Sequence, residues 1–143
     1  MPIVRRRQTK DRFEIYCRLV PLCASVVGDG LIDVLAWRTD TQRVLLIECK
    51  HVQHRKTEGE IAEQLADFRG EIKPDGKPDL LLRHIRRVTV ISESADVVAK
   101  YVGIFKPKLE GHLVFKNPVP MKFAWTQMEK KMPLHIFSDL DRL

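Results

Sequence analysis

The chain has 143 residues, of which 44% are hydrophobic and 31% are charged, with a formal net charge of +6 and a sequence pI of about 9.4. The length is that of one globular domain that can bury a core, and the basic balance indicates a moderate attraction to polyanions. No apolar run approaches a membrane span and the polar N-terminus lacks the apolar stretch of a signal peptide, so we exclude membrane contact and expect a cytoplasmic location.

The chain begins with a basic arm, residues 1–9, that carries Arg5, Arg6 and Arg7. Arginine side chains contact nucleic-acid phosphates, and we predict that role for these three. A solvated basic tail is the alternative interpretation. Residues 10–20 follow, where the i, i+3, i+4, i+7 spacing of apolar side chains predicts an amphipathic helix (Phe13, Tyr16, Cys17 and Val20).

Two apolar, β-branched runs come next, over residues 29–37 and 44–50, and they predict neighbouring strands joined by a turn at 39–42. Each would be an ordinary buried strand but for its charged residues, which are Asp33, Glu48 and Lys50. Ionised groups in a buried run are costly unless something compensates them. An edge hairpin with a surface salt bridge is the alternative.

Beyond this hairpin the sequence predicts a mixture of helices and strands. The elements are a helix over 61–70, a loop at 74–78, a short basic helix over 80–87, a strand at 88–91, a helix over 94–102 and a strand at 112–115. Arg86 and Arg87 of the basic helix are further candidates for phosphate contact. The mixture excludes the all-α and all-β classes and predicts a small mixed sheet flanked by helices.

Residues 104–143 extend the core, residues 10–103, and we expect one domain over the whole chain. In this C-terminal extension Phe123 and Trp125 alternate as in a strand. Nucleic-acid bases stack on such aromatic side chains, but packing in the core is the favoured interpretation.

Cysteine and histidine spacing points to neither a disulfide framework nor a zinc site. The three cysteines are odd in number and have no CxxC spacing, so we expect small buried thiols (Cys17, Cys23 and Cys49). His51 directly follows the second strand, and we favour it as a site rim or phosphate contact.

Register brings the charges of the hairpin together. If the turn is centred on residues 40–41, Asp33 lies directly opposite Glu48, with their Cβ atoms about 4.5–5.5 Å apart. Side chains alternate along a strand, so Lys50 shares the face of Glu48. A shift of one residue would move Asp33 to the other face.

A divalent cation suits two opposed carboxylates. Mg²⁺ commonly binds one or two carboxylates and keeps several waters, and the backbone carbonyl of Cys49 is a candidate third ligand. A bound cation lowers the pKa of water and stabilises charge on a phosphoryl group. Lys50 would assist the water or the phosphate, so the residues fit metal-assisted phosphodiester hydrolysis.

The same residues resemble the PD-(D/E)xK nuclease superfamily, and within it the Mrr-like restriction endonucleases. The matching positions are Phe13-Glu14, Asp29-Gly30-Leu31-Ile32-Asp33, Glu48-Cys49-Lys50 and, on the following helix, Gln64. This resemblance covers roughly residues 10–70 and implies a mixed α/β fold with a restriction-endonuclease-like αβββαβ core. It also implies supporting catalytic roles for Glu14 and Gln64.

The sequence therefore predicts an endodeoxyribonuclease that depends on Mg²⁺ or Mn²⁺, with Asp33 and Glu48 as metal ligands. Cleavage of both DNA strands would need two such sites, so a homodimer is expected. Two alternatives stay open. One is a nucleic-acid-binding or assembly module of a larger effector that keeps the fold without cutting, and the other is a ribonuclease.

Overall fold

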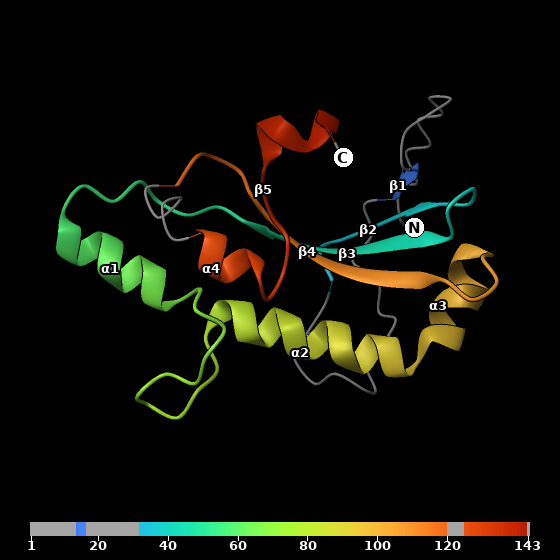
Figure 1. Ribbon diagram of the computed structural model, residues 1–143, viewed down its shortest axis with the longest axis horizontal. Coiled ribbons are helices and arrows are strands. Elements are labelled where there is room, and N and C mark those ends of the chain that lie inside the picture. Colours follow the sequence, from blue (N-terminus) through green and yellow to red (C-terminus); the bar gives the residue numbers. More distant parts are fainter. Residues whose placement is uncertain (1–13, 17–31, 120–124, 143) are drawn as a thin grey trace, which may run out of the picture. The chain divides into compact units, whose positions relative to one another are not determined.

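The computed structural model describes residues 14–16, 32–119 and 125–142. Figure 1 shows β1 (Glu14–Tyr16), β2 (Val34–Arg38), β3 (Arg43–Lys50), α1 (Glu58–Ala66), α2 (Leu80–Glu93), α3 (Ala95–Val102), β4 (Lys108–Phe115), α4 (Trp125–Glu129), β5 (Leu134–Ile136) and the 3-10 helix η2 (Phe137–Arg142). The predicted mixed α/β class is confirmed. Within the described ranges, no helix is both long enough and apolar enough to cross a membrane.

The chain separates into two compact units, and each unit is built from two stretches of sequence. The first unit comprises Met1–Glu48 and Arg87–Gly111, and the second comprises Cys49–Arg86 and His112–Leu143. The units alternate along the chain, and three elements begin in one unit and end in the other, namely β3, α2 and β4.

In the first unit, β1, β2 and β3 form an antiparallel sheet. The β2–β3 register pairs Val34 with Ile47 and Arg38 with Arg43, around a turn over residues 39–42. This is the register predicted from the sequence, and it is confirmed. The start of β4 continues the sheet beside β3, where the Lys108 amide donates to the Gln42 carbonyl over 2.8 Å.

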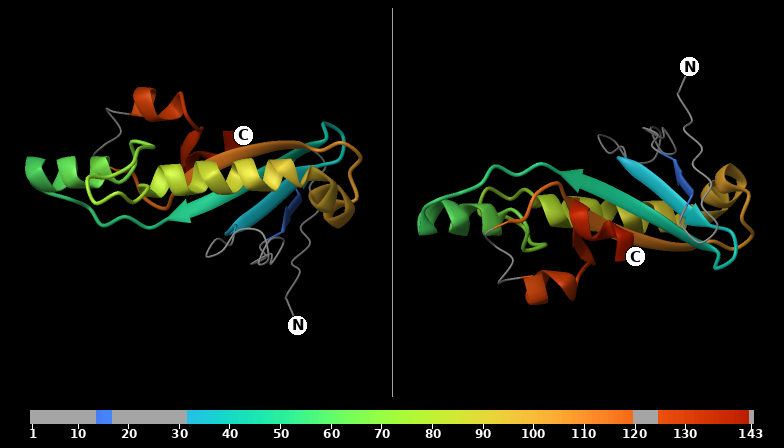
Figure 2. Two further views of the ribbon diagram at one scale, coloured as in Figure 1. Left: turned by 90° about the horizontal axis from the view of Figure 1, so that it is seen from below. Right: turned by 90° about the horizontal axis from the view of Figure 1, so that it is seen from above.

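One face of this hairpin carries the core of the first unit. Alternate residues of β2 and β3 pack there against the end of α2 and against α3, which lie on that face in both views of Figure 2. The core residues are Ile32, Leu35, Trp37, Val44, Leu46, Ile91, Val98, Val102 and Ile104. The core residues recur at every second position on the strands and with helical spacing on α2 and α3. Each element therefore has one apolar face, and these faces pack together.

The second unit has a core built around aromatic rings. The Phe68 and Phe115 rings meet edge to face at 5.2 Å, and Phe115 stacks on Trp125 at 5.9 Å. Strand β5 pairs in parallel with β4, with Leu113 opposite Leu134. Helix α1 starts at the N-cap Thr57, whose hydroxyl accepts from the Glu60 amide in a capping box.

Helix α2 confirms the predicted helix over 80–87 but contradicts the predicted strand at 88–91, which continues the same helix. Buried residues recur with helical spacing through the whole segment (Leu81, His84 and Ile91). The β-branched run favours a strand by propensity, but burial of a complete helical face outweighs that small preference. The buried Asp79 stabilises the helix start, because its Oδ1 accepts from the Leu82 amide over 2.8 Å.

The predicted helix over 10–20 is wrong at residues 14–16, which form β1; its other residues lie outside the described part. Strand β1 pairs with β2, with Glu14 opposite Trp37 and Tyr16 opposite Leu35. Pairing with an existing strand satisfies the backbone of this segment, and the helical spacing of its apolar residues did not reveal that partner.

Two smaller expectations also need correction. Trp125 begins α4 instead of lying on a strand, although it is buried as expected, and Met128 three residues later is buried beside it. Cys49 is exposed, because it lies near the end of β3 on the face opposite Glu48. Phe123, Cys17 and Cys23 fall outside the described residues.

Candidate metal centre

Two carboxylate residues, Asp33 and Glu48, flank the last residue pair at the open end of the β2–β3 hairpin. The observed β2–β3 pairing ends at Val34 and Ile47, one residue before the predicted Asp33–Glu48 pair, so that pair stays a prediction. Asp33 is half-buried in the bend before β2, and Glu48 is buried near the end of β3. Glu48 follows the core residue Leu46 by two positions on β3, so its side chain leaves the sheet on the face that the end of α2 and α3 cover.

Arg87 of α2 is the ionic partner of Glu48. Its Nη1 donates to the Glu48 Oε2 over 2.6 Å, and the two side chains are only 17% and 6% exposed. Arg87 shares a helical face with His84 and Ile91, three residues before it and four after it, and this face is buried. Its predicted contact with nucleic acid stays a prediction, but in this structure its guanidinium faces a carboxylate.

The pairing with Arg87 explains how a buried carboxylate is tolerated at this site. Two directly opposed carboxylates repel each other, and the repulsion is large where water is excluded. The guanidinium of Arg87 compensates the charge of Glu48 and makes the burial tolerable. A carboxylate accepts about four hydrogen bonds or metal bonds, so the contact with Arg87 does not by itself prevent Glu48 from binding a cation.

The donor set fits a hard divalent cation better than zinc. Asp33, Glu48 and the backbone carbonyl of Cys49 offer oxygen only, which suits Mg²⁺ or Mn²⁺ with waters completing the shell. No group of three or more histidine, cysteine, aspartate or glutamate side chains is placed to hold a metal among the described residues.

Lys50 and His51 follow Glu48 directly along the chain. Lys50 is the last residue of β3, two positions after Glu48, so the alternation of the strand puts both side chains on one face. The strand end is held by the Lys116 amide, which donates to the Lys50 carbonyl over 2.9 Å. His51 and, on α2, Arg86 are exposed, as a phosphate contact requires.

Gln64 and Glu14 complete the predicted catalytic set. Gln64 lies on α1 in the second unit, where it is 5% exposed and donates from Nε2 to the Gln53 carbonyl over 3.0 Å. Glu14 lies opposite Trp37, four residues along β2 from Asp33 and therefore roughly 13 Å away along the strand. The structure does not bring Glu14 beside Asp33, and Arg5, Arg6 and Arg7 lie outside the described residues.

The fold and the site thus define a mixed α/β protein with a buried glutamate paired to an arginine. A family model described as "Anti-phage protein Upx-like" matches residues 13–143. The match covers nearly the whole chain, and the chain belongs to this Upx-like family of anti-phage proteins. No curated protein and no solved structure matches the chain. The resemblance to PD-(D/E)xK nucleases stays a prediction from the sequence.

Sequence reasoning missed the partnership of Arg87 with Glu48. The two residues are 39 positions apart, and no local spacing connects them. The signal that could have placed Arg87 was the helical period of Leu81, His84 and Ile91, which continues through the segment taken for a strand. A single long helix would have put Arg87 on its buried face.

Proposed function

We propose that this protein acts in phage defence as a metal-dependent endonuclease that hydrolyses DNA phosphodiester bonds. The observation that carries the proposal is the β2–β3 register, confirmed as far as the Val34–Ile47 pair, with the half-buried Asp33 and the buried Glu48 next along the two chains. Membership of an anti-phage family supports the biological setting. Injected phage DNA is a phosphodiester substrate that such an activity would destroy.

The residues divide the chemistry in a definite way. Asp33 and Glu48 would hold Mg²⁺ or Mn²⁺, with the Cys49 carbonyl as a further ligand. The cation, when bound, lowers the pKa of water and stabilises charge on the phosphoryl group. Lys50 supplies positive charge on the same strand face and would orient the attacking water or the scissile phosphate.

Arg87 acts through Glu48 in this proposal and is a positioning residue. Its 2.6 Å contact fixes the orientation of the Glu48 carboxylate. A carboxylate that is already oriented loses less freedom when it binds a cation or a substrate. We therefore expect Arg87 to affect metal affinity without contacting the reacting phosphate.

The same ion pair is also compatible with a second function, the binding of nucleic acid without cleavage. Because a protein cation already compensates Glu48, the pair would also be stable in a module that binds nucleic acid without cutting it. In that case the basic residues would supply phosphate contacts, and Asp33 and Lys50 would have no catalytic role. The two functions differ in whether nucleic acid is cleaved.

A cleavage assay separates these functions. Supercoiled plasmid, single-stranded DNA and RNA are incubated with the protein in Mg²⁺, Mn²⁺ or EDTA. We expect DNA to be cut only with metal, and Asp33→Asn and Lys50→Ala to lower the rate at least about a hundredfold, as loss of a group that acts in the transition state does.

The matched control is Asp40→Asn, because Asp40 is an exposed carboxylate at the other end of the same hairpin. It should cut at the wild-type rate. Cleavage that persists in EDTA and in both site variants would contradict the metal-site mechanism. Salt-sensitive DNA binding with no cleavage of any substrate would favour the binding module, and cleavage restricted to RNA would identify a ribonuclease.

A further inference from the structure

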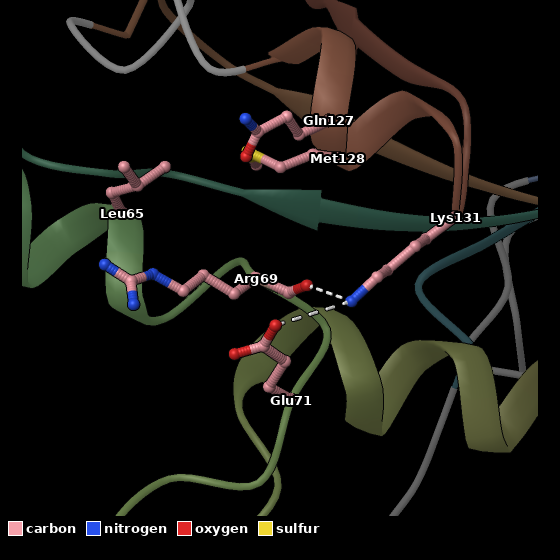
Figure 3. A pocket seen from close by; sticks show the side chains of 6 residues that line it. All are labelled: Leu65, Arg69, Glu71, Gln127, Met128 and Lys131. Carbon is pink, nitrogen blue, oxygen red and sulfur yellow. Dashed lines mark hydrogen bonds and ion pairs between the residues drawn. The ribbon is translucent and has the colours of Figure 1, made fainter.

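The second unit contains a pocket that the proposed nuclease chemistry does not use. It has a volume of about 350 Å³, at the lower end of the roughly 300–1,000 Å³ usual for small-molecule sites. Figure 3 shows side chains from α1, the loop after it, α4 and the residues after α4. The lining residues are Leu65, Arg69, Glu71, Gln127, Met128 and Lys131.

Lys131 fixes one wall of this pocket. Its Nζ donates to the carbonyl of Arg69 over 2.6 Å and to that of Gly70 over 3.2 Å, and it lies 3.9 Å from the Glu71 carboxylate. Gly70 has φ +72°, and a Cβ there would lie 2.8 Å from the Lys131 Cδ. Glycine therefore allows both the turn and the close approach of the lysine, which ties the loop to the end of α4.

Arg69 presents the cationic group that a ligand can use. Its side chain is exposed and extends toward Leu65, away from Lys131 (Figure 3), and no described side chain or carbonyl accepts a hydrogen bond from its guanidinium. A guanidinium offers five donors in a planar fork that matches two phosphate oxygens. With Lys131 also present, the lining carries two cations and one carboxylate, so its charge favours an anion.

The rest of the lining suits a ring attached to that anion. Met128 is buried and Leu65 is half-buried, so they give the pocket an apolar surface. The exposed amide of Gln127 stands beside Met128 and can both donate and accept, as the edge of a nucleobase requires (Figure 3). The exposed Glu71 carboxylate can accept a hydrogen bond from a sugar hydroxyl.

We propose that this pocket binds a nucleoside phosphate, with Arg69 on the phosphate and the base against Leu65 and Met128. The same chemistry is offered by a free nucleotide and by the 5′-phosphorylated end of a nucleic acid. The proposal is independent of the nuclease proposal, since it involves neither Asp33 nor Glu48.

Calorimetric titration in EDTA tests the pocket without metal-dependent cleavage. The ligands are AMP, adenosine, inorganic phosphate, and a short oligonucleotide with or without a 5′-phosphate. We expect AMP to bind more tightly than adenosine or phosphate alone. Arg69→Gln should weaken AMP at least about tenfold, which corresponds to about 1.4 kcal/mol, and Arg69→Lys should lie between it and the wild type.

Lys130→Gln is the matched control, because Lys130 is exposed next to the pocket but does not line it. It should bind AMP as the wild type does, and so should Asp33→Asn. Preference for the phosphorylated oligonucleotide over AMP would assign the pocket to a nucleic-acid end, and the reverse preference would assign it to a free nucleotide. No binding of any phosphorylated ligand, or equal binding by Arg69→Gln and the wild type, would overturn the proposal.

Discussion

Strand β3 begins and ends with an arginine–carboxylate pair, and the two pairs stand in different surroundings. At its start, Arg43 donates to both carboxylate oxygens of Glu110 on β4, over 2.9 and 2.8 Å. Near its end, Glu48 accepts from Arg87 of α2 over 2.6 Å. The first pair is 35% and 36% exposed, whereas the second is 17% and 6% exposed.

The comparison teaches that burial, more than bond geometry, decides how much stability is lost when one partner of an ion pair is removed. The Arg43–Glu110 pair has the better, two-pronged geometry, and Glu110 raises the pKa of Arg43, yet water screens half-exposed charges and limits the gain. The Arg87–Glu48 pair is joined through Nη1 and Oε2, and removing one partner would leave a charge in the core. Burying Glu48 therefore costs stability unless a cation compensates it, and a cation-binding role would explain why a carboxylate stands at this position.

The largest effect is expected from Arg87→Met, which removes the buried cation and keeps most of the side-chain volume. Glu48 would then be buried without its guanidinium, and we expect the free energy of unfolding to fall by about 3–5 kcal/mol. Urea unfolding followed by circular dichroism measures it. The double variant Arg87→Met/Glu48→Gln should recover much of the loss, and a single-variant loss below about 1 kcal/mol would contradict the importance given to burial.

The next effect concerns a buried carboxylate that is held by amides instead of an arginine. Asp79 is 1% exposed, and its two oxygens accept from the Leu82 amide over 2.8 Å and from the Glu71 amide over 2.9 Å. We expect Asp79→Ala to cost about 2 kcal/mol through loss of the helix cap and of a second buried acceptor. Asp79→Asn keeps one acceptor oxygen and should therefore cost less than Asp79→Ala. Equal losses for the two variants would show that the hydrogen bond kept by the asparagine oxygen contributes nothing.

A third prediction concerns pH and the half-buried His135, whose Nε2 lies 2.9 Å from the Nδ1 of His112. Burial lowers the pKa of His135 from 6.5, against the opposing charge of Glu129. The unfolded chain then binds a proton more readily than the folded chain, so stability should fall as the pH drops below about 6.5 toward the lowered pKa. His135→Gln should flatten this slope in urea melts between pH 8 and 5, and an unchanged slope would exclude His135 as its source.

The smallest effect is expected from the exposed pair. Arg43→Met should cost only about 0.2–1 kcal/mol, because the pair is solvated on both sides of the bond. Raising the salt concentration should shrink even this difference between variant and wild type. A loss comparable to that of Arg87→Met would remove the distinction between the two ends of β3.

The hairpin was predictable because its information is local. Alternating apolar residues and a short turn fix which residues of β2 and β3 face the core, and the observed register follows that rule. The start of α2 was predictable for a similar reason. Its second half was not, since Val88 and its neighbours favour a strand by propensity while the buried face of the helix continues through Ile91.

The parts of the sites that escaped prediction depend on contacts between distant residues. Arg87 and Glu48 are 39 positions apart, and Lys131 is 62 positions from the Arg69 carbonyl that it binds. Both contacts depend on how elements pack, and neither leaves a spacing pattern in the sequence. Glu48 itself was detectable, because a charge in a strongly apolar strand is anomalous wherever its partner lies.

Binding of Mn²⁺ by electron paramagnetic resonance tests the central claim most directly, because it reports the carboxylate pair without requiring the right substrate. The account predicts that the wild type and the Asp40→Asn control bind Mn²⁺ alike, while Asp33→Asn and Glu48→Gln, both checked for folding by circular dichroism, bind at least about tenfold more weakly, a loss of about 1.4 kcal/mol. Equal Mn²⁺ binding by the wild type and by both site variants, or no binding by the wild type, would contradict a metal centre at the end of this hairpin.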